Sequence, residues 1–111
     1  MINVNKMDFF MKQLGHPEHL TGTEYLRAGI EIAAADREAR ISKDIYPEVA
    51  RRYHTTPSRV ERCMSHSIET AFERGDRETI DDIFGYAIAV DTGRPTVGQY
   101  LKTMARVCRA D

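Results

Sequence analysis

The fold of this chain is decided by residues 45–75, IYPEVARRYHTTPSRVERCMSHSIETAFERG. Thr56 is a residue type that caps helix N-termini, and Pro57 suits the first position of a helix. Gly75 suits the position just after a helix end. These signals predict a long helix over residues 57–74, the best-delimited element of the sequence.

Another helix is expected just before this one, over residues 43–53, with Ser42 as its N-cap. Pro47 is compatible with this helix because the first turn loses no hydrogen bond at a proline. Residues 54–56 leave room only for a tight corner. His54 stands where such corners usually have glycine, and histidine tolerates a positive φ better than most residue types. Two helices joined by three residues have the dimensions of a helix-turn-helix.

The predicted helix over residues 57–74 has two distinct faces on a helical wheel. The apolar face, expected to point to the core, comprises Val60, Met64, Ile68, Ala71 and Phe72. The opposite face comprises Arg59, Arg62, His66, Glu69 and Glu73, with Ser58 and Ser65 on its flank. Side chains near the start of a recognition helix reach base edges, and arginine can bind guanine bidentately. Arg59 and Arg62 are therefore the leading candidates for DNA contact.

Other polar residues around the corner are candidates for contact with the DNA backbone. Thr55, Thr56 and Ser58 place hydroxyl groups near a helix N-terminus, where backbone amides attract phosphate. Arg51 and Arg52 could reach the backbone, or could only offset the dipole of the helix that they end. A structural alternative stays open, because helix pairs with short corners are common in all-α proteins and surface arginines are usually only solvated.

Helix signals also precede this pair. Asn5 is a candidate cap for a first helix, which Gly15 closes. A second helix can start at Thr21 or Thr23, and its apolar spacing continues to about Arg40.

The rest of the chain completes an all-α pattern. Asp76 caps a short helix that ends near Phe84. Residues 86–90 are apolar and could be extended, and a last helix is expected over residues 96–109. The sequence therefore predicts an all-α fold of about six helices around the helix-turn-helix, in a single compact domain over residues 1–111.

Length and composition narrow the class of protein. The chain has 111 residues, of which 16 are Lys or Arg and 17 are Asp or Glu, so its formal net charge of −1 gives no general support for nucleic-acid binding. Two cysteines are too few for the disulfide framework of a small secreted domain. No apolar run is long enough for a bilayer, and the first residues lack the pattern of a signal peptide. We therefore expect a cytoplasmic protein without membrane contact.

Metal binding and catalysis receive little support. His16 and His19 are three positions apart, as are Cys63 and His66, but neither pair resembles a paired zinc motif. The patterns of a nucleotide-binding loop, a zinc metalloprotease and a nucleophile elbow are missing from the sequence. The expectation is a protein without metal, cofactor or enzymatic activity.

Several stretches of the sequence resemble one family. They are LGHPEHLTGTEYLRAGIE (14–31), IYPEVARRYHTTPSRVER (45–62), HSIE (66–69), ERGD (73–76), IFGYAIAV (83–90) and RPT (94–96). Through them about residues 14–104 are similar to the C-terminal DNA-binding domain of the sporulation master regulator, stage zero sporulation protein A. The most specific part is SRVER joined to the upstream YPEVARRY.

The resemblance implies a six-helix effector domain whose helix-turn-helix recognises short boxes in double-stranded DNA to control transcription. It implies action at the bacterial nucleoid, often as tandem protomers or a homodimer, with room for contact with RNA polymerase or a sigma factor. By this resemblance, the DNA-contacting segment of the family includes Ser58, Arg59, Glu61 and Arg62. Ser65 stands where the family has arginine, and the expectation is a chain without the family's phosphorylated receiver domain.

Two functions follow from these observations. The leading one is sequence-specific DNA binding in transcription control, which Arg59, Arg62 and the intact cap at Thr56 favour. The alternative is a protein-interaction module of the same fold that binds a regulator or RNA polymerase with weak or no DNA binding. Ser65 and the near-neutral charge favour the alternative.

Overall fold

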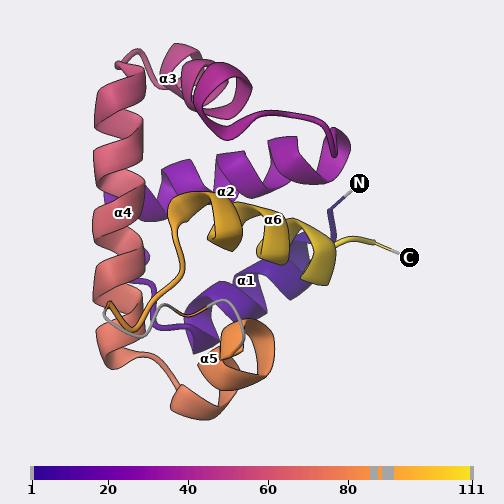
Figure 1. The fold of residues 1–111 in the computed structure, drawn as a ribbon, viewed down its shortest axis with the longest axis vertical. Helices are drawn as coiled ribbons and strands as arrows, with labels where there is room; N and C mark the ends of the chain where they lie inside the picture. The colour runs from indigo at the N-terminus through magenta and orange to yellow at the C-terminus, as the bar shows by residue number, and fades with distance from the viewer. Residues whose placement is uncertain (1, 86–87, 89–91, 111) are drawn as a thin grey trace.

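The computed structural model describes residues 2–85, 88 and 92–110, and in these residues the chain forms α-helices and no strand (Figure 1). The helices are α1 (Val4–Gln13), α2 (Thr21–Ala35), α3 (Tyr46–Arg52), α4 (Pro57–Arg74), α5 (Arg77–Phe84) and α6 (Val97–Val107), and a π-helical turn, η1 (Ile41–Ile45), leads into α3. The predicted all-α fold of six helices is confirmed. None of the described helices is both long and apolar enough to cross a membrane.

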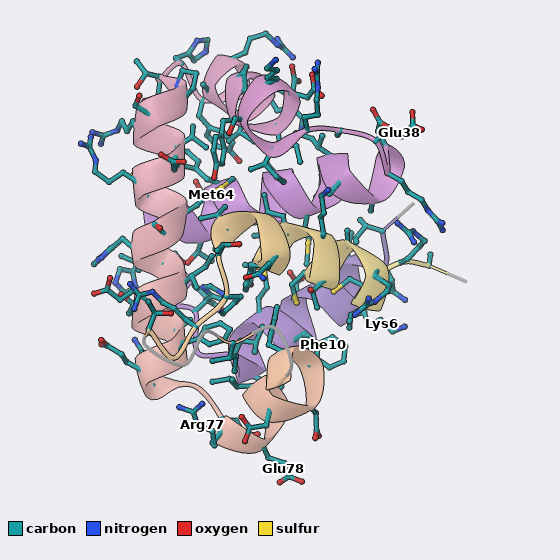
Figure 2. All side chains as sticks on the ribbon, viewed as in Figure 1. Lys6, Phe10, Glu38, Met64, Arg77 and Glu78 are labelled. Atoms are coloured by element: carbon teal, nitrogen blue, oxygen red, sulfur yellow. The ribbon has the colours of Figure 1, made fainter. Side chains whose placement is uncertain are left out.

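Helix α2 lies at the centre of the fold and makes its most extensive contacts with α4 and α6. In Figure 1 the long helix α4 forms one side of the molecule, α3 lies beside its amino end, and α5 lies near its carboxyl end. The side chain of Met64 points from α4 into the interior (Figure 2). The predicted apolar face of α4 is buried throughout, at Val60, Met64, Ile68, Ala71 and Phe72.

The helix-turn-helix forms as predicted, with α4 bounded as the sequence indicated. The side chain of Thr56 accepts a hydrogen bond of 3.2 Å from the backbone N–H of Arg59, which confirms the cap. His54 has a φ of 54°, the left-handed conformation that was expected at this corner. The backbone N–H of Thr55 donates to the carbonyl of Ala50 at 2.9 Å, so the corner is tied back onto α3.

Close contact between α2 and α4 depends on Gly22. A Cβ atom added there would lie 2.0 Å from the carbonyl oxygen of Cys63 and 3.0 Å from the Cβ of Ser67, both on α4. Real Cβ atoms do not approach other atoms this closely, so only a residue without a side chain lets the two helices meet at this distance. Gly22 therefore sets the separation between α4 and the rest of the core.

The N-cap of α1 is Asn3, so the prediction of Asn5 was wrong. The side chain of Asn3 accepts a hydrogen bond of 3.1 Å from a backbone N–H in the first turn. Its backbone N–H donates to the carbonyl of Cys108 at 2.8 Å, and Ile2 forms an antiparallel bridge with Arg109. The start of the chain is thus paired with its end, and the helix begins as soon as it leaves this pairing.

Helix α2 starts at Thr21, as predicted, but it ends at Ala35 instead of continuing to about Arg40. The side chain of Asp36 accepts a hydrogen bond of 3.0 Å from the backbone N–H of Glu38. This local bond competes with continuation of the helix and turns the chain.

The helix before the corner begins earlier than predicted, with the turn η1, and Ser42 is not its cap. The carboxylate of Asp44 accepts a hydrogen bond of 2.7 Å from the backbone N–H of Arg40 and also contacts the guanidinium of Arg40. The backbone N–H of Ile45 donates to the Arg40 carbonyl, five residues back, at 3.0 Å. Pro47 follows in the first turn of α3, where it was expected.

Helix α5 follows its predicted cap, Asp76, and α6 begins at Val97, one residue later than predicted, with Thr96 as its cap. Gln99 completes a capping box with Thr96, because each side chain accepts a backbone hydrogen bond from the other residue. Helix α6 ends at Val107 and not at residue 109, since the following residues pair with the chain start. The extended piece expected at residues 86–90 lies outside the described residues, except for residue 88.

The substitution Gly22→Ala is expected to lower the free energy of unfolding by about 3 kcal/mol. The added methyl group would collide with the carbonyl of Cys63, and this carbonyl cannot move unless α4 is displaced as a whole. Urea denaturation followed by circular dichroism measures the change. Gly85→Ala is the matched control, because a Cβ atom there meets nothing within 4 Å. A Gly22→Ala protein as stable as the control would show that α2 and α4 are not this close.

Candidate nucleic-acid interface

The exposed face of α4 carries two arginines near its amino end. Arg59 and Arg62 lie about one turn apart, and both are exposed. In the part of the chain that the structure describes, neither side chain forms an ion pair or a hydrogen bond. Each guanidinium therefore keeps all of its N–H groups for an external acceptor such as a phosphate or the edge of a guanine.

Two hydroxyl-bearing residues at the amino end of α4, Thr56 and Ser58, are exposed. The hydroxyl oxygen of Thr56 is engaged as the cap, and Thr55 is half-buried in the corner. Ser58 is exposed on the first turn. Backbone N–H groups in a first turn lack intrahelical acceptors and carry the positive end of the helix dipole, so this end of α4 is favourable for a phosphate.

Arg51 and Arg52 share one carboxylate, that of Glu48, which was not among the predicted residues. Glu48 accepts a hydrogen bond of 2.7 Å from Nη2 of Arg51 and one of 2.9 Å from Nε of Arg52. Hydrogen bonds from the two guanidinium groups lower the pKa of Glu48 to about 2. Residues three and four positions apart on a helix are neighbours, so this spacing was the signal that could have found Glu48.

The middle of the exposed face of α4 is formed by Glu61, Ser65 and His66, and all three are exposed. The charge of Glu61 acts on Tyr46 of α3, whose pKa is raised to about 12 by burial first and by this carboxylate second. The structure thus gathers the predicted residues around the amino-terminal half of α4. Its geometry is that of a helix-turn-helix with an open polar face.

Most of the chain matches a known protein family in its sequence. It matches the family described as sporulation initiation factor Spo0A C terminal over residues 7–108. The chain belongs to the Spo0A C-terminal domain family. The resemblance seen in the sequence is confirmed, and it extends beyond residues 14–104. This family consists of DNA-binding regulator domains of the sporulation response and not of enzymes.

In this Spo0A-type domain α4 is held by a buried chain of hydrogen-bonded side chains that was not predicted from the sequence. His16, in the turn before α2, is only 7% exposed. Its Nδ1 lies 2.8 Å from Oγ of Ser67 on α4, and its Nε2 lies 2.7 Å from the hydroxyl of Tyr100 on α6. Oγ1 of Thr23 on α2 lies 3.0 Å from Oγ of Ser67. These residues are far apart in the sequence, so no local pattern could have brought them together.

The hydrogen-bond directions from His16 to Pro17 follow from the last acceptor, the carbonyl of Pro17. Oγ1 of Thr23 donates to the carbonyl of Pro17 at 2.9 Å, so the Ser67 hydroxyl must donate to Thr23. Ser67 then accepts from Nδ1–H of His16. At neutral pH the ring carries only this proton, so its Nε2 accepts a hydrogen bond from the Tyr100 hydroxyl. Burial lowers the pKa of His16 to about 4, because a second ring proton would place a charge in the core.

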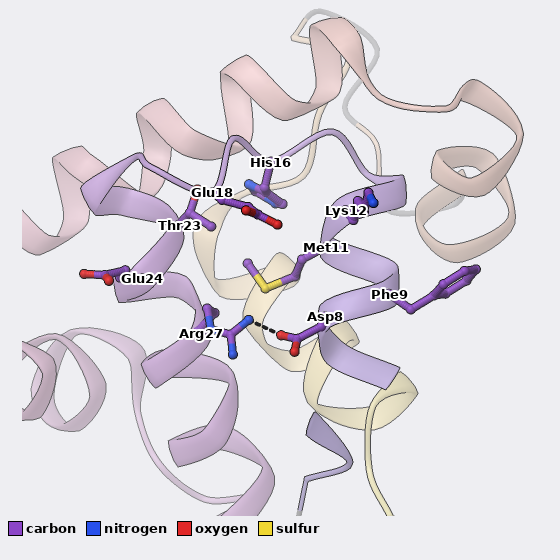
Figure 3. A pocket seen from close by; sticks show the side chains of 9 residues that line it. All are labelled: Asp8, Phe9, Met11, Lys12, His16, Glu18, Thr23, Glu24 and Arg27. Atoms are coloured by element: carbon purple, nitrogen blue, oxygen red, sulfur yellow. Dashed lines mark hydrogen bonds and ion pairs between the residues drawn. The ribbon is translucent and has the colours of Figure 1, made fainter. Parts of the chain in front are cut away.

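His16 also borders a cleft of about 430 Å³ between α1 and α2 (Figure 3). Arg27 of α2 forms an ion pair with Asp8 of α1 at this cleft, and Phe9 points away from it. Both ring nitrogens of His16 are hydrogen-bonded inside the core. The imidazole thus offers a molecule in the cleft neither a free donor nor a free acceptor.

The buried imidazole makes the stability of the domain pH-dependent. The folded pKa of about 4 lies below the unfolded value of 6.5, so the unfolded state binds the proton more readily. This stabilisation is complete above pH 6.5 and is lost as the pH falls to 4. We expect the free energy of unfolding to fall by roughly 3 kcal/mol over this range through His16 alone. Urea denaturation at a series of pH values measures the fall.

Two matched substitutions assign this effect to its residue. His16→Gln removes the titrating ring and should flatten the profile between pH 6.5 and pH 4, at a lower stability throughout. His19→Gln alters the exposed histidine of the same turn and should keep the profile of the unaltered domain. An unchanged slope in His16→Gln would show that another group is responsible.

Proposed function

We propose that this domain is a sequence-specific DNA-binding transcription regulator, with α4 as the recognition helix in the major groove. The observation that carries the proposal is the exposed pair Arg59 and Arg62 on a helix whose opposite face is buried in the core. Neither side chain has a partner in the described residues, so each can bind O6 and N7 of a guanine. Membership of the Spo0A C-terminal domain family supports DNA as the partner.

The other candidate residues take roles that follow from their positions. The residues that contact base edges are Arg59, Glu61, Arg62, Ser65 and His66. The residues that lie near phosphates are Arg51, Arg52, Thr55, Thr56 and Ser58. A carboxylate such as that of Glu61 accepts a hydrogen bond from the amino group of cytosine. Because Glu48 compensates one of its two guanidinium partners, Arg51 and Arg52 together bring one net positive charge to the DNA backbone.

The proposal extends to the setting in which the domain acts. Two protomers bind neighbouring DNA boxes in tandem or as a homodimer, in the cytoplasm at the nucleoid, and contact RNA polymerase or a sigma factor. Support for this setting comes from the family and not from a surface of the structure. Light scattering on complexes with one box or two boxes gives the number of bound protomers.

A protein-interaction module is the second candidate function. Two large apolar side chains on α1 favour it, because Val4 is 47% exposed and Phe9 is 57% exposed. Glu69 and Glu73, on the exposed face of α4, also disfavour contact with phosphates. A regulator protein could cover such surfaces without any DNA.

Fluorescence anisotropy separates the two functions. The unaltered domain is first used to select duplexes from a random pool, and its affinity is then measured for a selected duplex and for a scrambled one. DNA binding predicts a preference for the selected duplex and an affinity that falls steeply between low and physiological salt, because counterions are released on binding. Failure to enrich any duplex would favour the interaction module.

Arg62→Ala is expected to lower the affinity for the selected duplex by about 1–3 kcal/mol and to relax the base preference at one position. The reason is the loss of two donors from the middle of the reading face. Arg37→Ala is the control, because Arg37 is exposed in the turn after α2, away from α4. An equal loss on selected and scrambled DNA would make Arg62 a phosphate contact, and no loss would contradict α4 as the reader.

Ser65→Arg tests whether residue 65 reads bases. Serine offers one short hydroxyl, whereas arginine reaches farther and can place two donors on a guanine, a contact worth about 1–3 kcal/mol of discrimination. The variant should bind the DNA box of the family more tightly, by a larger factor than it gains on unrelated DNA. The charge alone would raise both affinities equally, so the ratio at one salt concentration is the quantity to measure. A constant ratio would show that residue 65 does not contact bases.

A further inference from the structure

A hollow beside the recognition helix α4 is lined on its other side by Arg94, a residue outside the helix-turn-helix. This hollow, of about 670 Å³, lies between α4 and the segment that leads into α6. Arg62 and Ser65 line it from α4, and Thr92 and Arg94 line it from the other side. The short side chain of Ser65 leaves the space between the two arginines open. Arg94 was not among the candidates that the sequence indicated.

Arg94 is held at this position by the recognition helix itself. Its Nη2 lies 3.5 Å from Oε2 of Glu69, and its Nη1 donates to the carbonyl of Thr92 at 3.4 Å. The Arg94 side chain is 36% exposed and that of Glu69 is 48% exposed, so the pair faces solvent. An exposed ion pair contributes little to stability. A guanidinium has five N–H groups, and these two contacts leave several of them for another acceptor.

The length of α4 brings this pair close to the DNA backbone when the amino end of the helix is in the major groove. The 18 residues of α4 extend about 27 Å at the rise of an α-helix. The major groove is only about 12 Å wide. Because this groove winds around the DNA axis and α4 is straight, the carboxyl half of the helix leaves the groove near a phosphate strand. Glu69 and Glu73 are exposed on that half, and uncompensated carboxylates would repel the phosphates.

We infer that Arg94 is a DNA-positioning residue, which neutralises Glu69 and contacts a backbone phosphate beside α4. This inference rests on the proposed DNA binding by α4. It adds a contact from outside the helix-turn-helix. Because phosphate contacts fix orientation but carry no sequence information, Arg94 would set how deeply and at what angle α4 enters the groove.

The test measures affinity for the selected and the scrambled duplex at several salt concentrations. Arg94→Gln should weaken binding to both duplexes by the same factor, about 5-fold to 10-fold, and should reduce the salt slope by about one. Arg94→Lys keeps the charge and should keep the slope. Glu69→Gln releases the guanidinium of Arg94 from its ion pair and should bind both duplexes more tightly. Arg37→Gln loses the same charge away from α4 and should leave affinity and slope nearly unchanged.

The outcomes separate this inference from the proposed function. If Arg62→Ala weakens binding while Arg94→Gln does not, the inference is overturned and the proposed function stands. A loss confined to the selected duplex would make Arg94 a base reader and would also overturn the inference. If the unaltered domain binds no duplex, both are overturned. If circular dichroism shows that Arg94→Gln does not fold, Glu69→Gln decides: tighter binding supports the inference, and unchanged or weaker binding overturns it.

Discussion

The placement of α4 depends on the buried chain of hydrogen bonds that runs from Tyr100 through His16 and Ser67 to Thr23 and Pro17. It joins α6, the turn before α2, α4 and α2 itself, and each link has only one arrangement of donor and acceptor. No buried side-chain nitrogen or oxygen among the described residues lacks a partner. Removal of one of these side chains would leave its neighbours in the core without a hydrogen-bond partner. The hydrogen-bonded residues therefore act as a unit and fix α4 against three other segments.

A second constraint acts on the same part of α4. Gly22 lets α2 touch the backbone of α4 at Cys63, one turn before Ser67 joins the polar chain. The middle of α4 is thus fixed by the close contact at Cys63 and by the hydrogen bonds of Ser67. Its amino end is fixed by the corner after α3. The residues that the proposal assigns to DNA lie mostly on the turns between these two supports. A rigid support of this kind presents a recognition helix without a large cost in conformational entropy.

The parts of the fold that follow from local chemistry could be predicted from the sequence. Thr56 begins α4 as predicted because a cap bonds within its own first turn. The start of α1 and the end of α6 could not be predicted, since both are decided by the pairing of Ile2 with Arg109. The polar chain of His16 was missed for the same reason. The exposed arginines of α4 were found because helical periodicity alone separates a polar from an apolar face.

The clean division of α4 into a buried and an open face affects how the domain can evolve. Arg59, Arg62 and Ser65 are exposed, so their replacement changes the chemistry offered to a partner with little effect on the packing of the core. Residues that set stability, such as Gly22 and Ser67, lie on the contacts with α2 and the neighbouring core. Preference for a new binding site can therefore arise by single substitutions, without compensating changes in the interior. Copies of this fold can diverge in what they recognise long before they diverge in how they fold.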